Sequence, residues 1–371
     1  MAPAPAMAPD RVPIGPIDIV IPHVDGAAPG YEALARQWTG EFVPCQLRDL
    51  GELRYVLRSL ERHAPWGRVV LVVQSPDHVP AWLRRERVRI VLHEDYIPAR
   101  LLPTFHWATI VAHMHLIPDL ADHFLIWEDD VVLSAPLAPA DVFDAEGLSP
   151  HPLDAAPIVP GLDRWLGTYQ LNLARSRALI HRRMPGRPSC FLHPHAPLSV
   201  RRSNWREFFD HFVVDPVFAE TIARRSRGDE RARPTIEPAV VYANWIEIAK
   251  RRRSSTRRHL DWLAAAIARL AAALPGVGRR RPPVFAKYAV VNDPIRMRRH
   301  MTRLLAERAL FMNVNDDAYD PWPGDDGTGR VNPASLRLLD ATLATMFPEP
   351  SGYERAAGAA SAAAVDPRTS D

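Results

Sequence analysis

The N-terminal half of the chain alternates segments typical of strands with segments typical of helices. Short apolar runs at 17–21, 69–73 and 88–92 are rich in Val and Ile, as strands are. In 51–62 the apolar residues instead recur three and four positions apart, as on one face of an amphipathic helix, and a second helix is expected near 104–116. This alternation predicts an α/β fold with a mostly parallel sheet flanked by helices.

The next strand-like run, within 124–132, leads directly into three adjacent carboxylates, Glu128, Asp129 and Asp130. Three anions at the end of a strand repel one another, so they need a cation, hydrogen-bond donors or water. Ligands of α/β proteins bind at the carboxyl ends of the strands, and Mg²⁺ takes one or two carboxylates together with phosphate oxygens. The pattern therefore predicts a divalent-metal site, with a solvated acidic turn as the alternative.

The length of 371 residues and an apolar content of 47% allow one large domain or two. Composition and pattern predict a disordered start at 1–15, an α/β core at 16–185, a more helical part at 186–354 and a disordered tail at 355–371. The formal net charge is only +3, and neither the basic runs nor the scattered aromatic residues match a nucleic-acid-binding module. We therefore expect no nucleic-acid partner.

The more helical part contains one basic amphipathic segment. Helices are expected at 205–225, 240–251 and 259–274, and the apolar residues of the last form a single stripe bracketed by arginines. Such a helix can lie on an anionic membrane surface, which predicts a peripheral membrane contact through 250–281. An ordinary packed helix with solvated arginines is the favoured alternative.

The cysteines and the apolar runs indicate where the protein works. Cys45 and Cys190 form neither a metal-binding pattern nor a disulfide framework. The first residues lack the layout of a signal peptide, and no apolar run approaches the length of a membrane helix. We expect a cytoplasmic protein, peripheral at the inner face of the membrane if the basic helix binds there.

Four blocks of sequence, in order, resemble the Stealth family of sugar-1-phosphate transferases. The first block is 17–26, and the second, RDLGELRYVLRSLERHAPW at 48–66, is the longest and most specific. The third is the Pro-His of 191–195, and the fourth is FMNVNDD at 311–317 followed by MFPEP at 346–350. The family includes bacterial capsular and exopolysaccharide phosphotransferases and the catalytic subunit of the N-acetylglucosamine-1-phosphotransferase.

The resemblance implies a reaction and a fold. A nucleotide-sugar donor gives up its sugar-1-phosphate to a hydroxyl of an acceptor glycan, a nucleoside monophosphate leaves, and a phosphodiester forms in capsule or exopolysaccharide synthesis. The sheet would be of the nucleotide-sugar-transferase type, with the more helical C-terminal half completing the site. Negative charge that develops at the diphosphate calls for preplaced positive charge.

The resemblance also implies Mg²⁺ as the cofactor, with Mn²⁺ as the alternative ion. The candidate ligands are Asp129 and Asp130, with Glu128 as a ligand or a neighbour of one. Asp316 is a further candidate because Asn315-Asp316 ends a second apolar, strand-like run. Asp130 is also counted among the catalytic residues.

The other catalytic candidates are histidines and arginines. His195 of the third block is the expected general base, because a pKa near neutrality suits removal of the acceptor's hydroxyl proton. His193 competes for this role, since the local match can shift by two positions. Arg48 and Arg54 are expected to contact phosphate or to hold nearby carboxylates. For the arginine of the third block, Arg227 and Arg231 remain equal candidates.

Asp25, Asp49, Glu52 and Asn315 are the candidate substrate-binding residues. Asp25 follows the first strand and suits recognition of the nucleotide or its ribose, with a plain turn former as the alternative. Asp49 and Glu52 have capping-box spacing, so a purely structural helix cap has equal weight.

Some positions depart from the family pattern. His23 stands in place of Trp, Leu50 of Asn, Glu128 of Asn and Val111 of Glu, and the stretch around Pro234 lacks an acidic pair. These changes keep a non-catalytic, glycan-binding relative open as a hypothesis. An ordinary glycosyltransferase that releases a nucleoside diphosphate is the other alternative.

Overall fold

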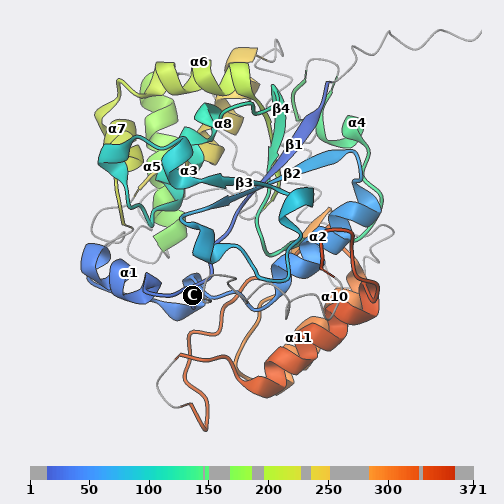
Figure 1. Cartoon of the computed structure of the whole chain (residues 1–371). Helices are drawn as coiled ribbons and strands as arrows, with labels where there is room; N and C mark the ends of the chain where they lie inside the picture. The colour runs from blue at the N-terminus through green and yellow to red at the C-terminus, as the bar shows by residue number, and fades with distance from the viewer. Residues whose placement is uncertain are drawn as a thin grey trace, which may run out of the picture.

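A computed structural model describes residues 15–144, 147–149, 168–185, 196–226, 235–250, 284–325 and 329–355. Its centre is a five-stranded sheet in the order β3-β2-β1-β4-β6 (Figure 1). The first four strands in the chain are parallel, as predicted, and β6 runs antiparallel to β4. The strands are β1 (Ile17–Pro22), β2 (Gly67–Val73), β3 (Arg89–Leu92), β4 (His123–Ile126) and β6 (Leu198–Arg201).

A second, three-stranded sheet continues from the end of β4. Its order is β5-β8-β7, with β8 antiparallel to β5 and parallel to β7. These strands are β5 (Val131–Leu133), β7 (Phe285–Lys287) and β8 (Phe311–Asn313). Because β4 belongs to one sheet and β5 to the other, the acidic segment between them lies at the junction of the two sheets.

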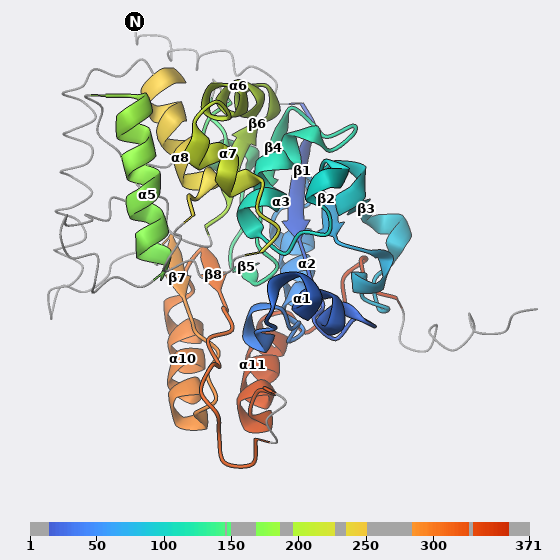
Figure 2. The ribbon, with the colours of Figure 1, turned by 90° about the vertical axis from the view of Figure 1, so that its left-hand side faces the viewer.

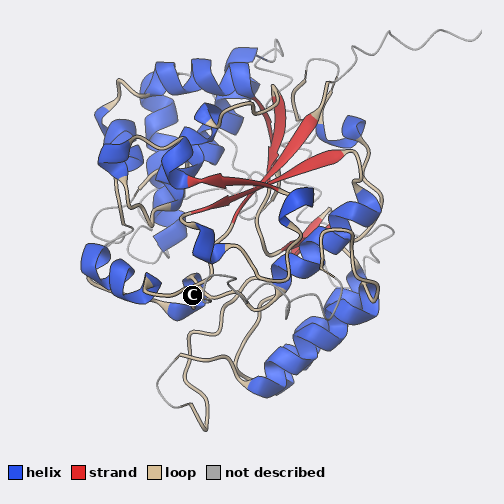
Figure 3. Ribbon diagram, in the orientation of Figure 1, coloured by secondary structure: helices blue, strands red, loops and turns tan. Residues whose placement is uncertain are grey.

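Helices cover both faces of the main sheet. Figure 3 shows the strands between two groups of helices, and Figure 2 shows α10 and α11 side by side beyond one end of the sheet. The helices are α1 (Tyr31–Thr39), α2 (Glu52–His63), α3 (Trp107–His113), α4 (Pro139–Val142), α5 (Thr168–Arg183), α6 (Arg202–Phe212), α7 (Pro216–Ile222), α8 (Pro238–Trp245), α10 (Pro294–Glu307) and α11 (Pro333–Met346).

The alternation of side chains along the strands divides the interior into two cores. Ile19 and Ile21 of β1 pack with Leu71 of β2 in the core that also contains α2, α10 and α11. Val20 and Val72 point to the opposite face, into the core formed with α3, α6, α7 and α8. Neighbouring residues of a strand face opposite sides, and a parallel sheet covered on both sides accordingly has continuous apolar strands.

Helix α2 carries the most specific part of the second family block. Its predicted apolar face is confirmed, since Leu53, Val56 and Leu60 are buried in the core. The capping box, one of the two interpretations of Asp49 and Glu52, does not form. The Asp49 carboxylate accepts the Gly51 N–H at 2.7 Å, and Gly51, at φ 93°, directly precedes the first helical residue. A left-handed φ of this kind favours glycine.

The C-terminal half contains more strand than was predicted. The helix expected at 205–225 is two helices, α6 and α7, because Pro216 starts a new helix after the Asp215 cap. The helix expected at 240–251 is α8 followed by a π-helical turn at Ile246–Lys250. The expected boundary at 185/186 does not separate two cores, since β6 joins the main sheet and 286–347 packs into the first core.

Several predictions concern residues outside the described ranges. These are the disordered ends at 1–14 and 356–371, the helix at 259–274 and nearly all of the membrane-contacting segment 250–281. Within the described residues, every helix is too short or too polar to cross a bilayer.

Candidate functional site

The carboxyl ends of β1 and β4 bring together residues that are far apart in sequence. Val20 of β1 pairs with Ile126 of β4, and the Trp127 N–H donates to the Val20 carbonyl at 2.9 Å. The segments that follow therefore run alongside each other. His23 and Asp129 meet there, with 2.7 Å between the ring Nδ1 and a carboxylate oxygen.

This His23–Asp129 pair is buried on one side and open on the other. The His23 side chain is 1% exposed, whereas that of Asp129 is 35% exposed. Burial of the ring is the largest influence and lowers its pKa, but the hydrogen bond to Asp129 and the charges of Asp129, Asp49 and Asp25 outweigh it. The net effect is a raised pKa for His23. Asp129, Asp49 and Asp25 therefore all lie close enough to His23 for their charges to act on its ring.

The pKa of Glu52 is affected by burial and also by nearby negative charge. Burial raises the pKa of its carboxyl well above the usual range, and the charges of Asp49, Asp129 and Asp130 raise it further, against a backbone hydrogen bond that lowers it. Its carboxylate accepts the Leu50 N–H at 2.7 Å. Acidic residues from the start of α2 and from the β4–β5 segment therefore form one acidic cluster, consisting of Asp25, Asp49, Glu52, Asp129 and Asp130.

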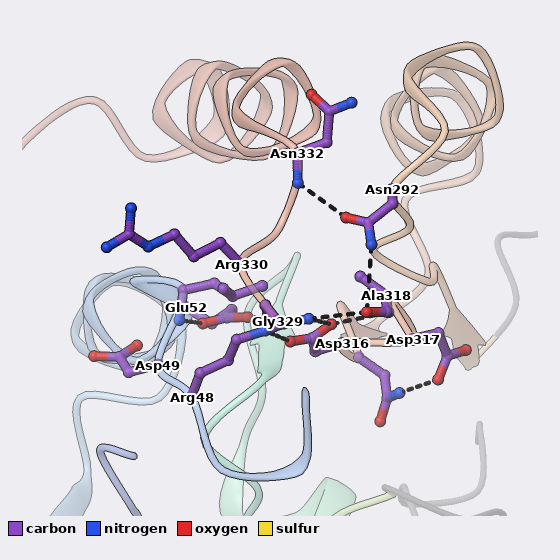
Figure 4. Close-up of polar contacts among 12 residues, drawn as sticks. Arg48, Asp49, Glu52, Asn292, Asp316, Asp317, Ala318, Gly329, Arg330 and Asn332 are labelled. Atoms are coloured by element: carbon purple, nitrogen blue, oxygen red, sulfur yellow. Dashed lines mark hydrogen bonds and ion pairs between the residues drawn. The ribbon is translucent and has the colours of Figure 1, made fainter. Parts of the chain in front are cut away.

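Arg48 forms a buried ion pair with Asp316 next to this cluster (Figure 4). Its Nη2 donates to one carboxylate oxygen at 2.9 Å, and its Nε donates to the other. The guanidinium also donates to the carbonyls of Gly329 and Ala318. The expectation that Arg48 holds Asp49 or Glu52 is therefore wrong, because its hydrogen bonds go to the segments after β8.

Asp316 is engaged by this pair. Both of its oxygens accept hydrogen bonds from Arg48, and one also accepts the Ala318 N–H at 3.0 Å. Each carboxylate oxygen has two lone pairs, so the predicted role of Asp316 as a further metal ligand stays a prediction. Asn315, its neighbour, donates to the Asp317 carboxylate at 2.6 Å. The exit of β8 still touches the acidic segment, since the Val314 N–H donates to the Asp130 carbonyl at 2.9 Å.

Asp25 and Arg54 lie in different surroundings. The Asp25 carboxylate accepts the Ala27 N–H at 2.9 Å, so it forms a turn while its charge still acts on His23. The Arg54 guanidinium lies 5.0 Å from the centre of the Trp82 ring, and its Nε is 3.6 Å from the Glu354 carboxylate. Arg54 therefore does not hold Asp49 or Glu52 either.

Glu128 lies close to helix α5. Burial is the main cause that raises the pKa of Tyr169 on α5, and the charges of Glu237 and Glu128 add to it. Glu128 thus lies close enough to α5 to influence a tyrosine there. Its predicted role beside the metal stays a prediction.

His193, His195, Arg227, Arg231 and Pro234 lie outside the described residues. Sequence reasoning missed the role of His23, which it noted only as a departure from a family pattern. Its place between a predicted strand and Asp25 is the signal that could have marked it.

Residues 46–151 match the family described as Stealth protein CR2, conserved region 2. Over 352 residues the chain is 30% identical to an exopolysaccharide phosphotransferase of Streptomyces coelicolor, in an alignment that covers 92% of this chain and 57% of that relative. This chain therefore carries conserved region 2 of the Stealth family.

A receptor polysaccharide phosphotransferase of Streptococcus oralis is 32% identical over 167 residues, which are 42% of this chain and 49% of the relative. The chain thus spans about half the length of the curated relatives it matches. A galactosyltransferase structure in complex with donor and acceptor sugar analogues aligns with this chain at a TM-score of 0.34 and 15% identity. The alignment covers 90% of this chain and 98% of the galactosyltransferase chain. A likeness of this size supports no conclusion about function.

The described departures from the Stealth pattern now have positions in the fold. Val111 on α3 is fully buried in the second core, so in this chain the position serves packing. Leu50 packs against the first core beside Glu52. His23 has a polar role, since its ring bonds Asp129 in the acidic cluster.

Proposed function

We propose that this protein transfers a sugar-1-phosphate from a nucleotide-sugar donor to a hydroxyl of an acceptor glycan. The observation that carries the proposal is the acidic cluster, which gathers three separate segments at the carboxyl ends of β1 and β4. Ligands of α/β proteins bind at this edge. Two relatives with phosphotransferase names, from Streptomyces coelicolor and Streptococcus oralis, point to the same chemistry.

We propose that Asp129 and Asp130 hold a Mg²⁺ ion, with Mn²⁺ as the alternative. Among the described residues, no group of three or more His, Cys, Asp or Glu side chains is arranged to hold a metal by itself. Two carboxylates are nevertheless a sufficient protein contribution for Mg²⁺, which completes its coordination with phosphate oxygens and water. Burial is the main cause of the raised pKa of Glu52, and the charges of Asp49, Asp129 and Asp130 raise it further; a cation would offset these charges, which supports the fit.

The bound ion would supply positive charge to the diphosphate of the donor. The chain's own residues prepare the site for it. His23 bonds one oxygen of Asp129 and so orients this carboxylate. The Arg48–Asp316 pair ties the loop before α2 to the segment after β8, which keeps Asp49 and Glu52 close to the β4–β5 segment.

The proposed reaction is one displacement at phosphorus. The acceptor hydroxyl attacks the phosphorus atom next to the sugar, a new P–O bond forms, and the bond to the leaving nucleoside monophosphate breaks. The hydroxyl proton passes to a general base, for which His195 and His193 remain the candidates. Asp25 and Asn315 remain candidates for contacts with the donor. We further propose a cytoplasmic location, peripheral at the inner face of the membrane if the segment 250–281 binds there.

The identity of the released nucleotide tests this proposal. The protein is incubated with a panel of nucleotide sugars, Mg²⁺ and a polysaccharide acceptor, and the products are separated by ion-exchange chromatography. Release of a nucleoside monophosphate together with phosphate in the glycan is expected. Release of a nucleoside diphosphate would instead identify an ordinary glycosyltransferase. A folded protein that shows no turnover and no thermal shift with any donor would favour the glycan-binding alternative.

A further inference from the structure

A pocket of about 400 Å³ opens between the start of α10 and the segment that follows β8. Asp317 and Ala318 line it, and they directly follow Asp316, the partner of Arg48. The far wall carries Trp322 and Asp320. The pocket thus lies beside the buried ion pair and uses none of the residues of the acidic cluster.

Asn292 fixes the walls of this pocket relative to each other. Its buried amide donates to the carbonyls of Ala318 and Asp320, and its side-chain oxygen accepts the Asn332 N–H at 2.9 Å. Figure 4 shows this amide between the start of α11 and the segment after β8. The Asn292 side chain therefore holds together three segments: the start of α10, the segment after β8 and the start of α11.

The indole of Trp322 is also held in place. Its Nε1 donates to the Arg330 carbonyl at 3.0 Å. Gly324 lies against the ring with φ 97°, and a Cβ at this glycine would come within 3.1 Å of the indole Cζ3. Any other residue at this position would strain the backbone and press on the ring, so the pocket keeps a fixed aromatic wall.

The remaining polar groups are available to a ligand. Within the described ranges, the side chains of Asp320 and Arg296 take part in no hydrogen bond or ion pair, and both line the pocket. Asp317 is instead paired with Lys287 at 3.0 Å, and Asp293 caps α10. A free carboxylate accepts from hydroxyl groups and a free guanidinium donates to them, so both suit a polyol.

The charge of the pocket excludes the donor's diphosphate. Three carboxylates line it, and because Lys287 offsets the charge of Asp317, those of Asp293 and Asp320 remain against the guanidinium of Arg296. A phosphate would meet net repulsion there, whereas an uncharged ligand would not. Such a ligand needs hydroxyl groups for Asp320 and Arg296 and an apolar face for Trp322. A sugar ring has both, because its C–H groups form a flat apolar face.

We propose that this pocket binds an uncharged sugar residue of the acceptor glycan. The ring packs on Trp322, and its hydroxyls bond Asp320 and Arg296. That the pocket binds a sugar follows from its own residues; that this sugar belongs to the acceptor rests on the proposed function.

Two variants test the pocket without touching the acidic cluster. Asp320→Asn removes an exposed charge, and Trp322→Ala removes the aromatic wall. Each is measured by saturation-transfer NMR against a panel of neutral hexoses, N-acetylhexosamines and 6-deoxyhexoses at millimolar concentration. At least one sugar is expected to bind the wild type and to bind each variant about tenfold to a hundredfold more weakly. The matched controls, Asp210→Asn on α6 and Trp38→Ala on α1, are expected to bind like the wild type.

The outcomes separate the pocket from the proposed function. The proposed sugar pocket is overturned if the wild-type protein binds no sugar of the panel, or if both variants bind the sugar with the affinity of the wild type. Inorganic phosphate that displaces the bound sugar would also overturn it. Sugar binding that depends on Asp320 and Trp322, in a protein without nucleotide-sugar turnover, supports the pocket while the proposed function fails. If turnover exists, the variants are expected to raise the KM for the acceptor and to leave the KM for the donor unchanged.

Discussion

Replacement of Arg48 by methionine is expected to destabilise the fold severely. The guanidinium makes two hydrogen bonds to Asp316 and bonds two backbone carbonyls. The Arg48 and Asp316 side chains are only 15% and 8% exposed. Without Arg48, the Asp316 carboxylate stays buried with no counter-ion, and methionine fills much of the volume but supplies no donor.

The expected loss in the free energy of unfolding is about 3–5 kcal/mol, the cost of removing one partner from a buried ion pair. Native domains have only about 5–15 kcal/mol in total. Arg48→Lys keeps the charge but cannot bond both oxygens of Asp316 in parallel, so an intermediate loss is expected. The double variant Arg48→Met with Asp316→Leu removes both charges and is expected to recover a large part of the stability.

Urea unfolding followed by tryptophan fluorescence measures these differences. Arg36→Ala is the matched control, because Arg36 pairs with Glu32 on the surface of α1 and the two side chains are 55% and 56% exposed. This control is expected to lose less than about 1 kcal/mol. An Arg48→Met loss no larger than that of the control would refute a buried, structural ion pair and would return Arg48 to the phosphate-binding candidates.

Three further variants test the acidic cluster. Glu52→Gln is expected to raise the melting temperature at pH 7, because the pKa of Glu52 is higher in the folded than in the unfolded protein and its ionisation therefore costs stability as the pH rises. The gain should vanish below about pH 4, where Glu52 is protonated in both states. An equal shift of the melting temperature at both pH values would contradict this cause. For His23→Phe, the stability lost relative to wild type should be largest below about pH 6.5 and should shrink as the pH rises through the raised folded pKa, whereas a loss independent of pH would show that only ring packing matters. Asp130→Asn should abolish nucleotide release with a nearly unchanged melting temperature, and full activity in this variant would remove Asp130 from the site.

The sequence alone predicted the elements whose pattern is local and long. The strand near 17–21, the strand at 69–73 and the apolar face of α2 are confirmed, because several neighbouring residues form the same local apolar run or repeat. The acidic segment was correctly placed at the end of a strand, and the parallel sheet followed from the alternation of elements. Strands β5, β6 and β7 were missed. They have only three or four residues each, and strands this short were predicted only where the apolar run extends beyond them, as for β3 and β4.

The partners of the site residues were decided by the tertiary structure. Arg48 and Asp316 are 268 positions apart, and His23 and Asp129 are 106 apart. No local sequence pattern predicts which carboxylate Arg48 or His23 contacts. The answer depends on strand order. Because β1 lies beside β4 in one sheet and β5 beside β8 in the other, the loops that follow them converge. The sequence thus determined which charged groups the chain carries and at which strand ends they lie; the pairing of the strands determined which of these groups share a buried environment, where charge interactions are strong.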